Sequence, residues 1–513
     1  MKRQSVVLIS AFLFFAGFFS FAQEELEPVS DRISTLLAGY LSNDVTFQKA
    51  TINEQLASLS ATTARINNGM AFSISSGTVT VYATGNGTSV EMKPNASLSI
   101  PSANDTTVSA SVPLTFQNGS TATEKTSTVS SNEVSIKNAS VTVSTGIITG
   151  TPLSKKISIL EAERKYLEAR RNAQDAAVTA EKDFYTALKK LYNYGVSVLT
   201  KRGTLYDDSL DLKKLIAQGY STGSSSYLKA DLKVRSDQRN VTEAERLLER
   251  ETAIFATKCG FDYQKTSGNA YESAMAFLPL SIPEVEILDP ESFPAEAYSA
   301  SETAAWNKYI AQLKRDANKQ LTLKGNLGYT FNNSYSSSDT VDAGLSLNWR
   351  GISATAGVSF ATGNSVFGAA SSSSSSGSSR TTDPVYTFSL GWTPNTWRLS
   401  KITDQQNQLN QMLEEVNIRS AKNDYETSIE SKLTAISDLQ WSKQSYQEER
   451  AMYEKLANDM ASWYRQGIIT ENDYLDAKDN AAKAQINLLI NAIDVILFND
   501  ETRLLFHTDE GLK

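Results

Sequence analysis

The sequence has almost none of two residue types on which catalysis and metal binding often depend. Its 513 residues include one cysteine, Cys259, and one histidine, His507. A single cysteine excludes an internal disulfide and a cysteine metal cluster, and a single histidine excludes a multi-histidine metal site and argues against a histidine-based triad. We expect Cys259 to be a buried, small apolar side chain and His507 to lie at the surface.

Nucleotide-binding signatures are also missing. No phosphate-binding glycine loop or dinucleotide fingerprint occurs in the chain. The net charge of −8 and the pI near 5.1 argue against nucleic acid as a partner. These absences predict a protein that is not an enzyme, has no cofactor or metal site, and binds no nucleic acid.

Long apolar runs are confined to the start of the chain. Met1-Lys2-Arg3 precedes an apolar run from Val6 to Phe21, and Ser20-Phe21-Ala22 has the small residues of a cleavage site. Residues 1–22 therefore predict a secretory signal peptide, with an uncleaved anchor as the alternative. After residue 22 we expect no segment with the roughly 20 apolar residues of a transmembrane helix. A membrane-embedded form would then have to be a closed β-barrel.

A duplicated motif organises the rest of the chain. Residues 466–477 read QGIITENDYLDA, and residues 218–230 read QGYSTGSSSYLKA. Both copies begin Gln-Gly and close Tyr-Leu-x-Ala, and they lie roughly half the chain apart, which indicates a duplicated architecture. Helix-compatible sequence flanks each copy. The polar, glycine-containing centre of each copy therefore predicts the turn of a long helical hairpin.

Apolar residues recur every seven positions around both turns, which predicts left-handed coiled coils. The ascending arms, residues 155–217 and 398–465, would each be roughly 95–100 Å long at 1.5 Å per residue. The residues in this register are Phe184, Leu191, Val198, Leu205, Leu212, Tyr227, Val234, Val241, Leu248, Phe255, Tyr446, Tyr453, Met460, Tyr474, Ala481, Leu488 and Val495.

Two further stretches alternate apolar and polar residues with a period of two, as strands with one apolar face do. Segments of about ten residues with Gly, Ser, Thr and Asn on one face are typical of transmembrane strands. A soluble β-sandwich is the alternative. The aromatic residues in or at the ends of these strands fit interfacial girdles, and they are Phe116, Tyr329, Phe331, Trp349, Phe360, Tyr386, Trp392 and Trp397.

These patterns divide the chain into successive segments. The predicted order is an N-terminal helix (23–68), a first β block of barrel strands (69–152), a first long helical hairpin (153–259) with its tip near 218–227, a connector with a short helix (260–318), a second β block of barrel strands (319–394), and a second long helical hairpin (395–507) with its tip near 466–474.

The sequence resembles the TolC-like outer-membrane efflux proteins over nearly the whole mature chain. The most specific match is Tyr464-Arg465-Gln466-Gly467 followed by residues 473–477 (DYLDA), which look like the second coiled-coil tip of that family. The resemblance implies an α+β membrane protein with two structural repeats. It forms a homotrimer, in which a shared transmembrane β-barrel is continuous with a long α-helical coiled-coil barrel.

The function implied by the resemblance is that of an outer-membrane exit duct of a tripartite efflux or type I secretion system. Such a duct is a passive, gated channel in contact with outer-membrane lipid that extends into the periplasm. Its partners would be further copies of itself, a periplasmic adaptor protein and an inner-membrane pump. A non-transporting surface protein, an adhesin with a coiled coil and a β head, is the alternative, and a soluble periplasmic enzyme is a more distant one.

The sequence departs from the family pattern in two ways. Family members contribute two strands per repeat, whereas here the second β block offers about four alternating segments and the first at least four. Either the barrel is larger, or some segments form an extra layer outside the membrane. At the tips, Ser226 and Ile469 replace an acidic residue and an arginine of the family, which puts polar locks between the hairpins in doubt.

Asp473 and Asp476 match the pore-constriction aspartates of the family. They are three residues apart and share one helix face, so a trimer would place two rings of carboxylates around one axis and favour cations. Alternatively, acidic residues in a first helical turn complement the helix dipole, with Thr470 as the N-cap. Lys229 occupies the position in the first copy that matches Asp476, and it could pair with an aspartate.

The two turns are candidates for adaptor docking, because apolar residues at exposed tips suggest a partner surface. Simple hairpin turns with incidental apolar residues are the alternative. Tyr464 matches a tip tyrosine of the family and is a candidate closed-state contact, although a core role is open too. The docking candidates are Gly219, Tyr220, Ser221, Thr222, Gly467, Ile468, Ile469 and Thr470.

Overall fold

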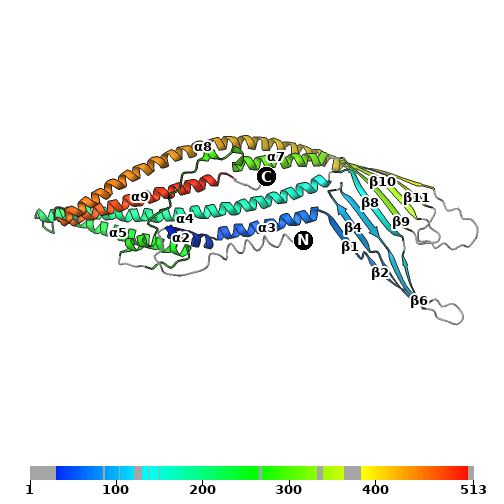
Figure 1. The fold of residues 1–513 in the computed structure, drawn as a ribbon, viewed down its shortest axis with the longest axis horizontal. Coiled ribbons are helices and arrows are strands. Elements are labelled where there is room, and N and C mark those ends of the chain that lie inside the picture. The colour runs from blue at the N-terminus through cyan, green and yellow to red at the C-terminus, as the bar shows by residue number, and fades with distance from the viewer. Residues whose placement is uncertain are drawn as a thin grey trace, which may run out of the picture. The chain divides into compact units, whose positions relative to one another are not determined.

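The fold is known from a computed structural model in which helices and strands alternate along the chain (Figure 1). It describes residues 30–84, 87–102, 104–120, 130–136, 138–149, 151–264, 269–319, 321–331, 339–362 and 383–506. The expected signal peptide, most of the serine-rich segment near residues 369–383, and His507 lie outside these residues.

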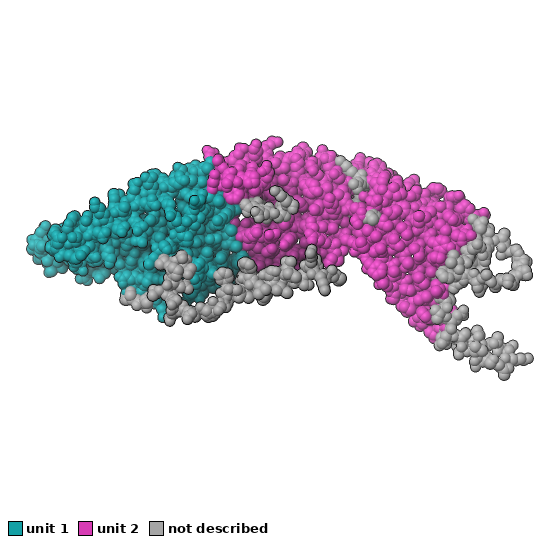
Figure 2. Space-filling view, viewed as in Figure 1, with its two compact units in different colours: residues 1–47, 177–288, 432–503 teal, residues 48–176, 289–431, 504–513 magenta. Residues whose placement is uncertain are grey.

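The chain forms two compact units, coloured separately in Figure 2. Unit 1 consists of residues 1–47, 177–288 and 432–503, and unit 2 consists of residues 48–176, 289–431 and 504–513. Two long helices, α4 (Thr151–Ala217) and α8 (Pro394–Arg465), contribute to both units. Each unit is described by itself below.

Unit 1 is a helical bundle with a largely apolar core. It contains α2 (Ser30–Asn43), α5 (Ser225–Lys258), α6 (Ala270–Phe277), α9 (Glu471–Arg503) and the adjoining parts of α4 and α8. The sevenfold apolar register accounts for part of this packing, because seven of its seventeen residues are buried and the other ten are half-buried. The buried ones are Phe184, Leu191, Val198, Val241, Leu248, Phe255 and Val495, none more than 8% exposed.

The prediction that Cys259 is buried is confirmed, because this residue is 1% exposed within the core. Helix α9 does not confirm the expectation that no apolar stretch follows residue 22. By length and composition it could cross a membrane. Its apolar residues are instead used in the bundle, where Ile486, Ile493 and Ile496 are buried.

The N-terminal helical segment contains a break that the sequence analysis did not predict. Where one N-terminal helix was expected, α2 ends at Asn43 and α3 runs from Val45 to Asn68. Asp44 separates them and accepts a hydrogen bond from the backbone N–H of Phe47 (2.7 Å), as an N-cap residue does.

Two helices of unit 2 are joined by a largely buried ion cluster. Arg164 and Arg171 of α4, each about 5% exposed, both bind Glu302 of α7 (Ser299–Lys319). Arg164 also lies over the ring of Trp306. The 3₁₀ turns η1 (Pro290–Ser292) and η2 (Ala295–Ala297) precede α7.

Unit 2 also contains two antiparallel sheets. Sheet A has eight strands in the order β1-β4-β5-β8-β9-β10-β11-β12, and sheet B has four in the order β2-β3-β6-β7. The strands are β1 (Ala71–Ser75), β2 (Val79–Thr84), β3 (Gly87–Met92), β4 (Asn95–Ile100), β5 (Thr106–Ser111), β6 (Leu114–Ser120), β7 (Ser130–Ile136), β8 (Ala139–Ile148), β9 (Thr322–Phe331), β10 (Thr340–Trp349), β11 (Ile352–Ala361) and β12 (Val385–Trp392).

The first eight strands are four long strands, each interrupted once at a common level. β1 continues into β2, β3 into β4, β5 into β6, and β7 into β8, so the two sheets share one strand order. The interruptions fall at Gly77 and Asn138, both with positive φ, and at Pro94 and Pro113. Proline removes a ladder donor and positive φ marks a bulge, so each strand breaks where its sequence disfavours regular pairing.

Candidate functional site

Both helical tips end with the same backbone motif. In the first, Gly219 N–H donates to Ile216 O (3.0 Å) and Tyr220 N–H to Leu215 O (3.1 Å). In the second, the equivalent bonds run from Gly467 to Tyr464 and from Ile468 to Trp463. The two glycines have φ values of +81° and +72°. This is the Schellman motif, which explains why glycine follows the end of each ascending helix.

The second tip continues into a capping box at the start of α9. The Thr470 hydroxyl accepts from the Asp473 N–H (3.3 Å), and the Asp473 carboxylate accepts from the Thr470 N–H (3.0 Å) and hydroxyl (2.7 Å). These reciprocal bonds satisfy N–H groups that a helix start leaves open. The capping alternative for these residues is therefore realised in the structure. At the first tip Ser224 caps α5 alone, through a bond from the Tyr227 N–H.

The two aspartates of interest differ in their surroundings. The Thr470 hydrogen bonds lower the pKa of Asp473. Asp476 lies one turn further along α9 and is half-buried against α4, where one of its oxygens is 3.0 Å from the position a Cβ would take on Gly203. Burial, with a contribution from the nearby Asp207 carboxylate, raises the pKa of Asp476. Asp476 will therefore take up a proton at a higher pH than Asp473.

A third carboxylate, which the sequence analysis missed, extends this line. Asp479 follows Asp476 by three residues on α9, and burial raises its pKa. It accepts a hydrogen bond from the Tyr206 hydroxyl of α4 (3.4 Å). The Asn472 side chain also donates to the Tyr206 carbonyl (3.2 Å). The i, i+3, i+6 spacing of Asp473, Asp476 and Asp479 was the available sequence signal.

Lys229 faces different groups from the ones expected. It lines a surface pocket of about 470 Å³ between α4 and α5, together with Asp208, Lys214 and Lys233. The lysine whose charge acts on Asp473 is Lys214, in the last turn of α4. Pairing of Lys229 with a tip aspartate thus remains a prediction, and Lys214 is a nearer cation that the sequence analysis overlooked.

The apolar tip residues are exposed to different degrees. Tyr220 is 47% exposed and Ile468 is 65% exposed, whereas Ile469 is half-buried. The ring of Tyr464 stacks on that of Tyr474 across the second tip, with centroids 5.2 Å apart. Tyr464 therefore holds its own hairpin together, and its role as a closed-state contact stays a prediction. Within the described ranges no group of three metal-ligating side chains is found.

Two family models match consecutive parts of the chain. Residues 36–282 match the TP096X N-terminal domain, and residues 283–509 match the TP096X C-terminal domain. Together they leave only the ends of the chain unmatched. The chain belongs to the TP096X family. The boundary at residue 282 separates the two repeats of this TP096X protein, each with a β block and a helical hairpin.

Solved structures similar to this TP096X protein include three bacterial outer membrane proteins. VceC of Vibrio cholerae, an outer membrane protein, has a TM-score of 0.44 and 12% identity, over 93% of this chain and 97% of that chain. The MtrE outer membrane channel of Neisseria gonorrhoeae has a TM-score of 0.47 and 12% identity, over 92% of this chain and 88% of that chain. The CmeC outer membrane channel of Campylobacter jejuni has a TM-score of 0.41 and 12% identity, over 96% of this chain and 92% of that chain. No curated protein matches the chain.

Proposed function

We propose that this protein is a passive outer-membrane exit duct of a tripartite efflux or type I secretion system, assembled from three copies. The observation that carries the proposal is one apolar face that continues across all eight strands of sheet A. Its central row follows the strand register residue by residue, and consists of Phe72, Leu98, Val108, Val143, Leu327, Ala343, Val358 and Tyr386.

The opposite face of sheet A is polar. Ser73 bonds to Ser97 (2.8 Å), Ser109 to Thr142 (2.5 Å), and Thr355 to Ser389 (2.6 Å). A sheet with one apolar and one hydroxyl-rich face suits lipid on one side and water on the other. A soluble sandwich would cover the apolar face, yet Phe388 and Leu390 are about 80% exposed.

The edges of sheet A support assembly from several copies. Among the described strands, β1 and β12 each have one hydrogen-bonded neighbour. An open sheet edge cannot remain unpaired in lipid, so a spanning sheet must close on itself or on further copies. We infer that neighbouring copies pair at these edges and complete one shared β-barrel.

The helices of unit 2 carry faces suited to the same assembly. Exposed apolar residues on α3 and α8 recur at intervals of three, four and seven, which is the pattern of a coiled-coil seam left without a partner. On α3 these residues are Ile52, Leu56, Leu59 and Ile66, and on α8 they are Leu399, Ile402, Leu409, Met412, Leu413 and Val416. Packing of such faces between copies would form the α-helical barrel.

The tips complete the proposal. In a trimer, Asp473 and Asp476 would line the narrow end of the duct and favour cations. The turns at Gly219–Thr222 and Gly467–Thr470 would receive the periplasmic adaptor, and the inner-membrane pump would supply the energy. The protein itself performs no chemistry, and its polar sheet face would line the path of the cargo.

The decisive experiment is ion conductance of the purified mature protein in planar lipid bilayers, with its mass in detergent measured on the same preparation. We expect a trimer that forms small, cation-selective channels blocked by multivalent cations. A monomer, or a trimer that forms no channel even after both aspartates are replaced by alanine, would overturn the duct and favour a surface adhesin.

A further inference from the structure

The apolar face of the sheets does not run straight across the strands. On β12 it extends from Tyr386 toward the helix-proximal end of the strand, through Phe388 and Leu390 to Trp392. On the first long strand it starts at Phe72 and extends the other way, into β2 as far as Val81. Tyr386 and Phe72 lie in the same register row. On β12 that row is therefore the end of the apolar band farthest from the helices, whereas on β1 it is the end nearest to the helices.

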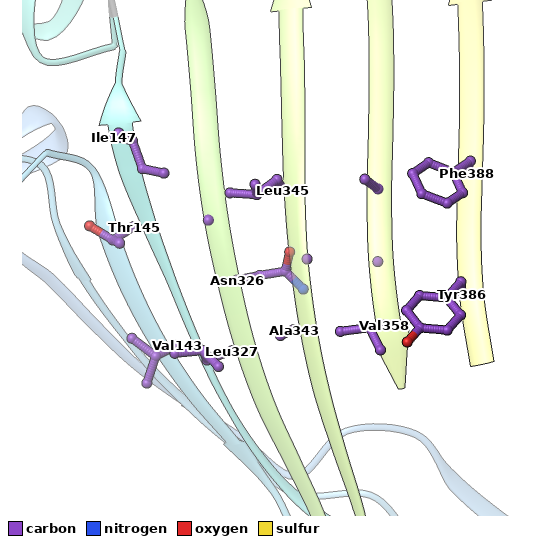
Figure 3. Close-up of a pocket in the computed structure, with 14 residues that line it drawn as sticks. Val143, Thr145, Ile147, Asn326, Leu327, Ala343, Leu345, Val358, Tyr386 and Phe388 are labelled. Carbon is purple, nitrogen blue, oxygen red and sulfur yellow. The ribbon is translucent and has the colours of Figure 1, made fainter. Parts of the chain in front are cut away.

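The intervening strands show the same progressive shift. On β10 and β11 the band is centred at Leu345 and Ala356, one row nearer the helices than the Phe72–Tyr386 row. On β5 and β6 it runs from Val108 to Phe116 and is centred two rows further from the helices, at Val112. Figure 3 shows its middle part, where Leu345 and Phe388 lie in one row and Ala343, Val358 and Tyr386 lie in the next.

The shift gives the slope of the band. Between β12 and β1–β2 the centre moves about seven residues, which is about 23 Å along the strands at 3.3 Å per residue. Seven strand spacings of about 4.8 Å make about 34 Å across the sheet, so the band slopes by about 35°. Strands in a membrane barrel tilt by about 35–45° from the axis. A level lipid layer crossing strands of this tilt produces the observed slope.

The slope also places sheet B. Beyond the strand interruptions, its first row on this face is Val79, Met92, Leu114 and Ile136, and the next contains Val81, Val90 and Phe116. These rows extend the sloping apolar band along β2, β3, β6 and β7, beyond the interruptions of the four long strands. Sheet B is thus a continuation of the lipid-facing wall, and the alternative of an extra layer outside the membrane does not fit its apolar rows.

We propose that β12 of a second copy pairs along both β1 and β2, with Tyr386 opposite Val81, Phe388 opposite Val79 and Trp392 opposite Ile74. The pairing is antiparallel, since β1 follows α3 and β12 leads into α8. With this pairing, the apolar band shifts from β1–β2 to the neighbouring β12 in the same direction as it does within one chain. The band therefore continues around the shared β-barrel. This inference rests on the proposed assembly of several copies and specifies its β seam.

The residues of this seam meet the requirements of such a contact. Val79, Val81, Tyr386 and Trp392 are all at least 50% exposed in the single chain. In this seam Leu390 lies opposite the bulge at Gly77, where the first long strand has one extra residue. The positive φ of Gly77 accommodates that residue, so the apolar side chains of β1 and β2 stay on the same face of the sheet. A straight, unsloped seam would instead set Tyr386 opposite Phe72, which is about 25 Å from Val81 along the strand.

Two matched double-cysteine variants distinguish these registers. Both are made in the full chain in a Cys259→Ala background, and both contain Tyr386→Cys. One adds Val81→Cys and the other adds Phe72→Cys, an equally exposed residue of the same face. Outer membranes from expressing cells are treated with a short bismaleimide crosslinker, and the products are resolved by denaturing electrophoresis. The mass of each untreated variant in mild detergent is measured in parallel.

We expect the Val81→Cys pair to give covalent dimers and trimers, and the Phe72→Cys pair to give none. Crosslinking of the Phe72→Cys pair instead would overturn the sloping register while leaving the assembly in place. A trimeric mass with no crosslink in either variant would overturn the β seam and leave contacts between helices. A monomeric mass for the parent chain would contradict the proposed function itself, so the two failures are separable.

Discussion

At the scale of single residues, the two tip aspartates have unequal chemistry although they look equivalent in sequence. The capping bonds from Thr470 lower the pKa of Asp473, whereas burial against α4 raises the pKa of Asp476. A carboxylate fixed in a capping box can still present its charge to a pore. Capping and pore lining are therefore compatible roles for Asp473.

This inequality predicts how selectivity depends on pH. As the pH falls from neutral, Asp476 gains its proton first, so cation preference should decline in two steps, the first from Asp476 and the second, more acidic, from Asp473. Asp476→Asn should remove the first step and leave the second. Replacing both aspartates by alanine should raise conductance and reduce cation preference. Reversal potentials in a salt gradient measure the effect, and an unchanged profile in Asp476→Asn would contradict it.

A second residue-scale prediction concerns a buried carboxyl in the core of unit 1. Asp500 is 1% exposed, one of its oxygens has no hydrogen-bond partner, and Arg503 lies 3.4 Å from the other. Burial, reinforced by the nearby Glu181 carboxylate, raises the pKa of Asp500 to about 7. Because the folded state holds this proton more tightly than the unfolded state, stability should fall as the pH rises from about 4 to 7.

Asp500→Asn should remove the loss of stability that the parent protein shows as the pH rises. The gap between 7 and the ordinary value of 3.8 corresponds to on the order of 4 kcal/mol above pH 7. We expect the melting temperature of the variant, followed by the helical circular dichroism signal, to exceed that of the parent at pH 8 and to match it near pH 4. Asp438→Asn, an exposed position on α8, is the control. Equal pH dependence in parent and Asp500→Asn would refute the burial argument.

At the scale of elements, the helical tips combine a rigid turn with an open surface. A Cβ at Gly467 would have nothing within 4 Å, so its positive φ, not lack of space, is what requires glycine. Asparagine tolerates this conformation, whereas a β-branched residue is strained by it. Substitutions at one position can therefore separate the shape of the tip from its surface.

Gly467→Val should loosen the turn, and Gly467→Asn should preserve it. Hydrogen exchange of the backbone around residues 463–475 should be faster in the valine variant and unchanged in the asparagine variant. Binding of the periplasmic adaptor should fail in both if the tip surface docks there, since the asparagine side chain fills space the partner needs. Normal adaptor binding by Gly467→Asn would make the glycine purely structural.

At the scale of the whole molecule, the exposed apolar faces of α3 and α8 require partners. Leu409 and Leu413 of α8 are 65% and 55% exposed, respectively. Replacing both by glutamate should shift the purified protein from trimer toward monomer, because charge in an apolar seam is strongly unfavourable. Light scattering coupled to size exclusion in mild detergent measures this. Gln408→Glu, on the same turn, should remain trimeric, and a trimeric Leu409→Glu, Leu413→Glu variant would exclude this face from the assembly.

The sequence by itself determined the local structure. Sevenfold and twofold periodicities place core side chains such as Leu248 and strand residues such as Leu345 on single faces, and these periods follow from helix and strand geometry. The turn glycines were equally readable, because positive φ after a helix has few alternatives to glycine. The two TP096X domains meet at residues 282 and 283, between the two copies of the tip motif.

Only the tertiary structure decided what depends on neighbours far away in sequence. Strand pairing showed that the eight segments of the first β block are four long strands, and its register revealed the slope of the apolar band. The separate surroundings of Asp473 and Asp476, and the inclusion of Asp479, depend on how α9 packs against α4. Burial and pairing arise from contacts between distant segments, whereas a periodic pattern records only which face a residue occupies.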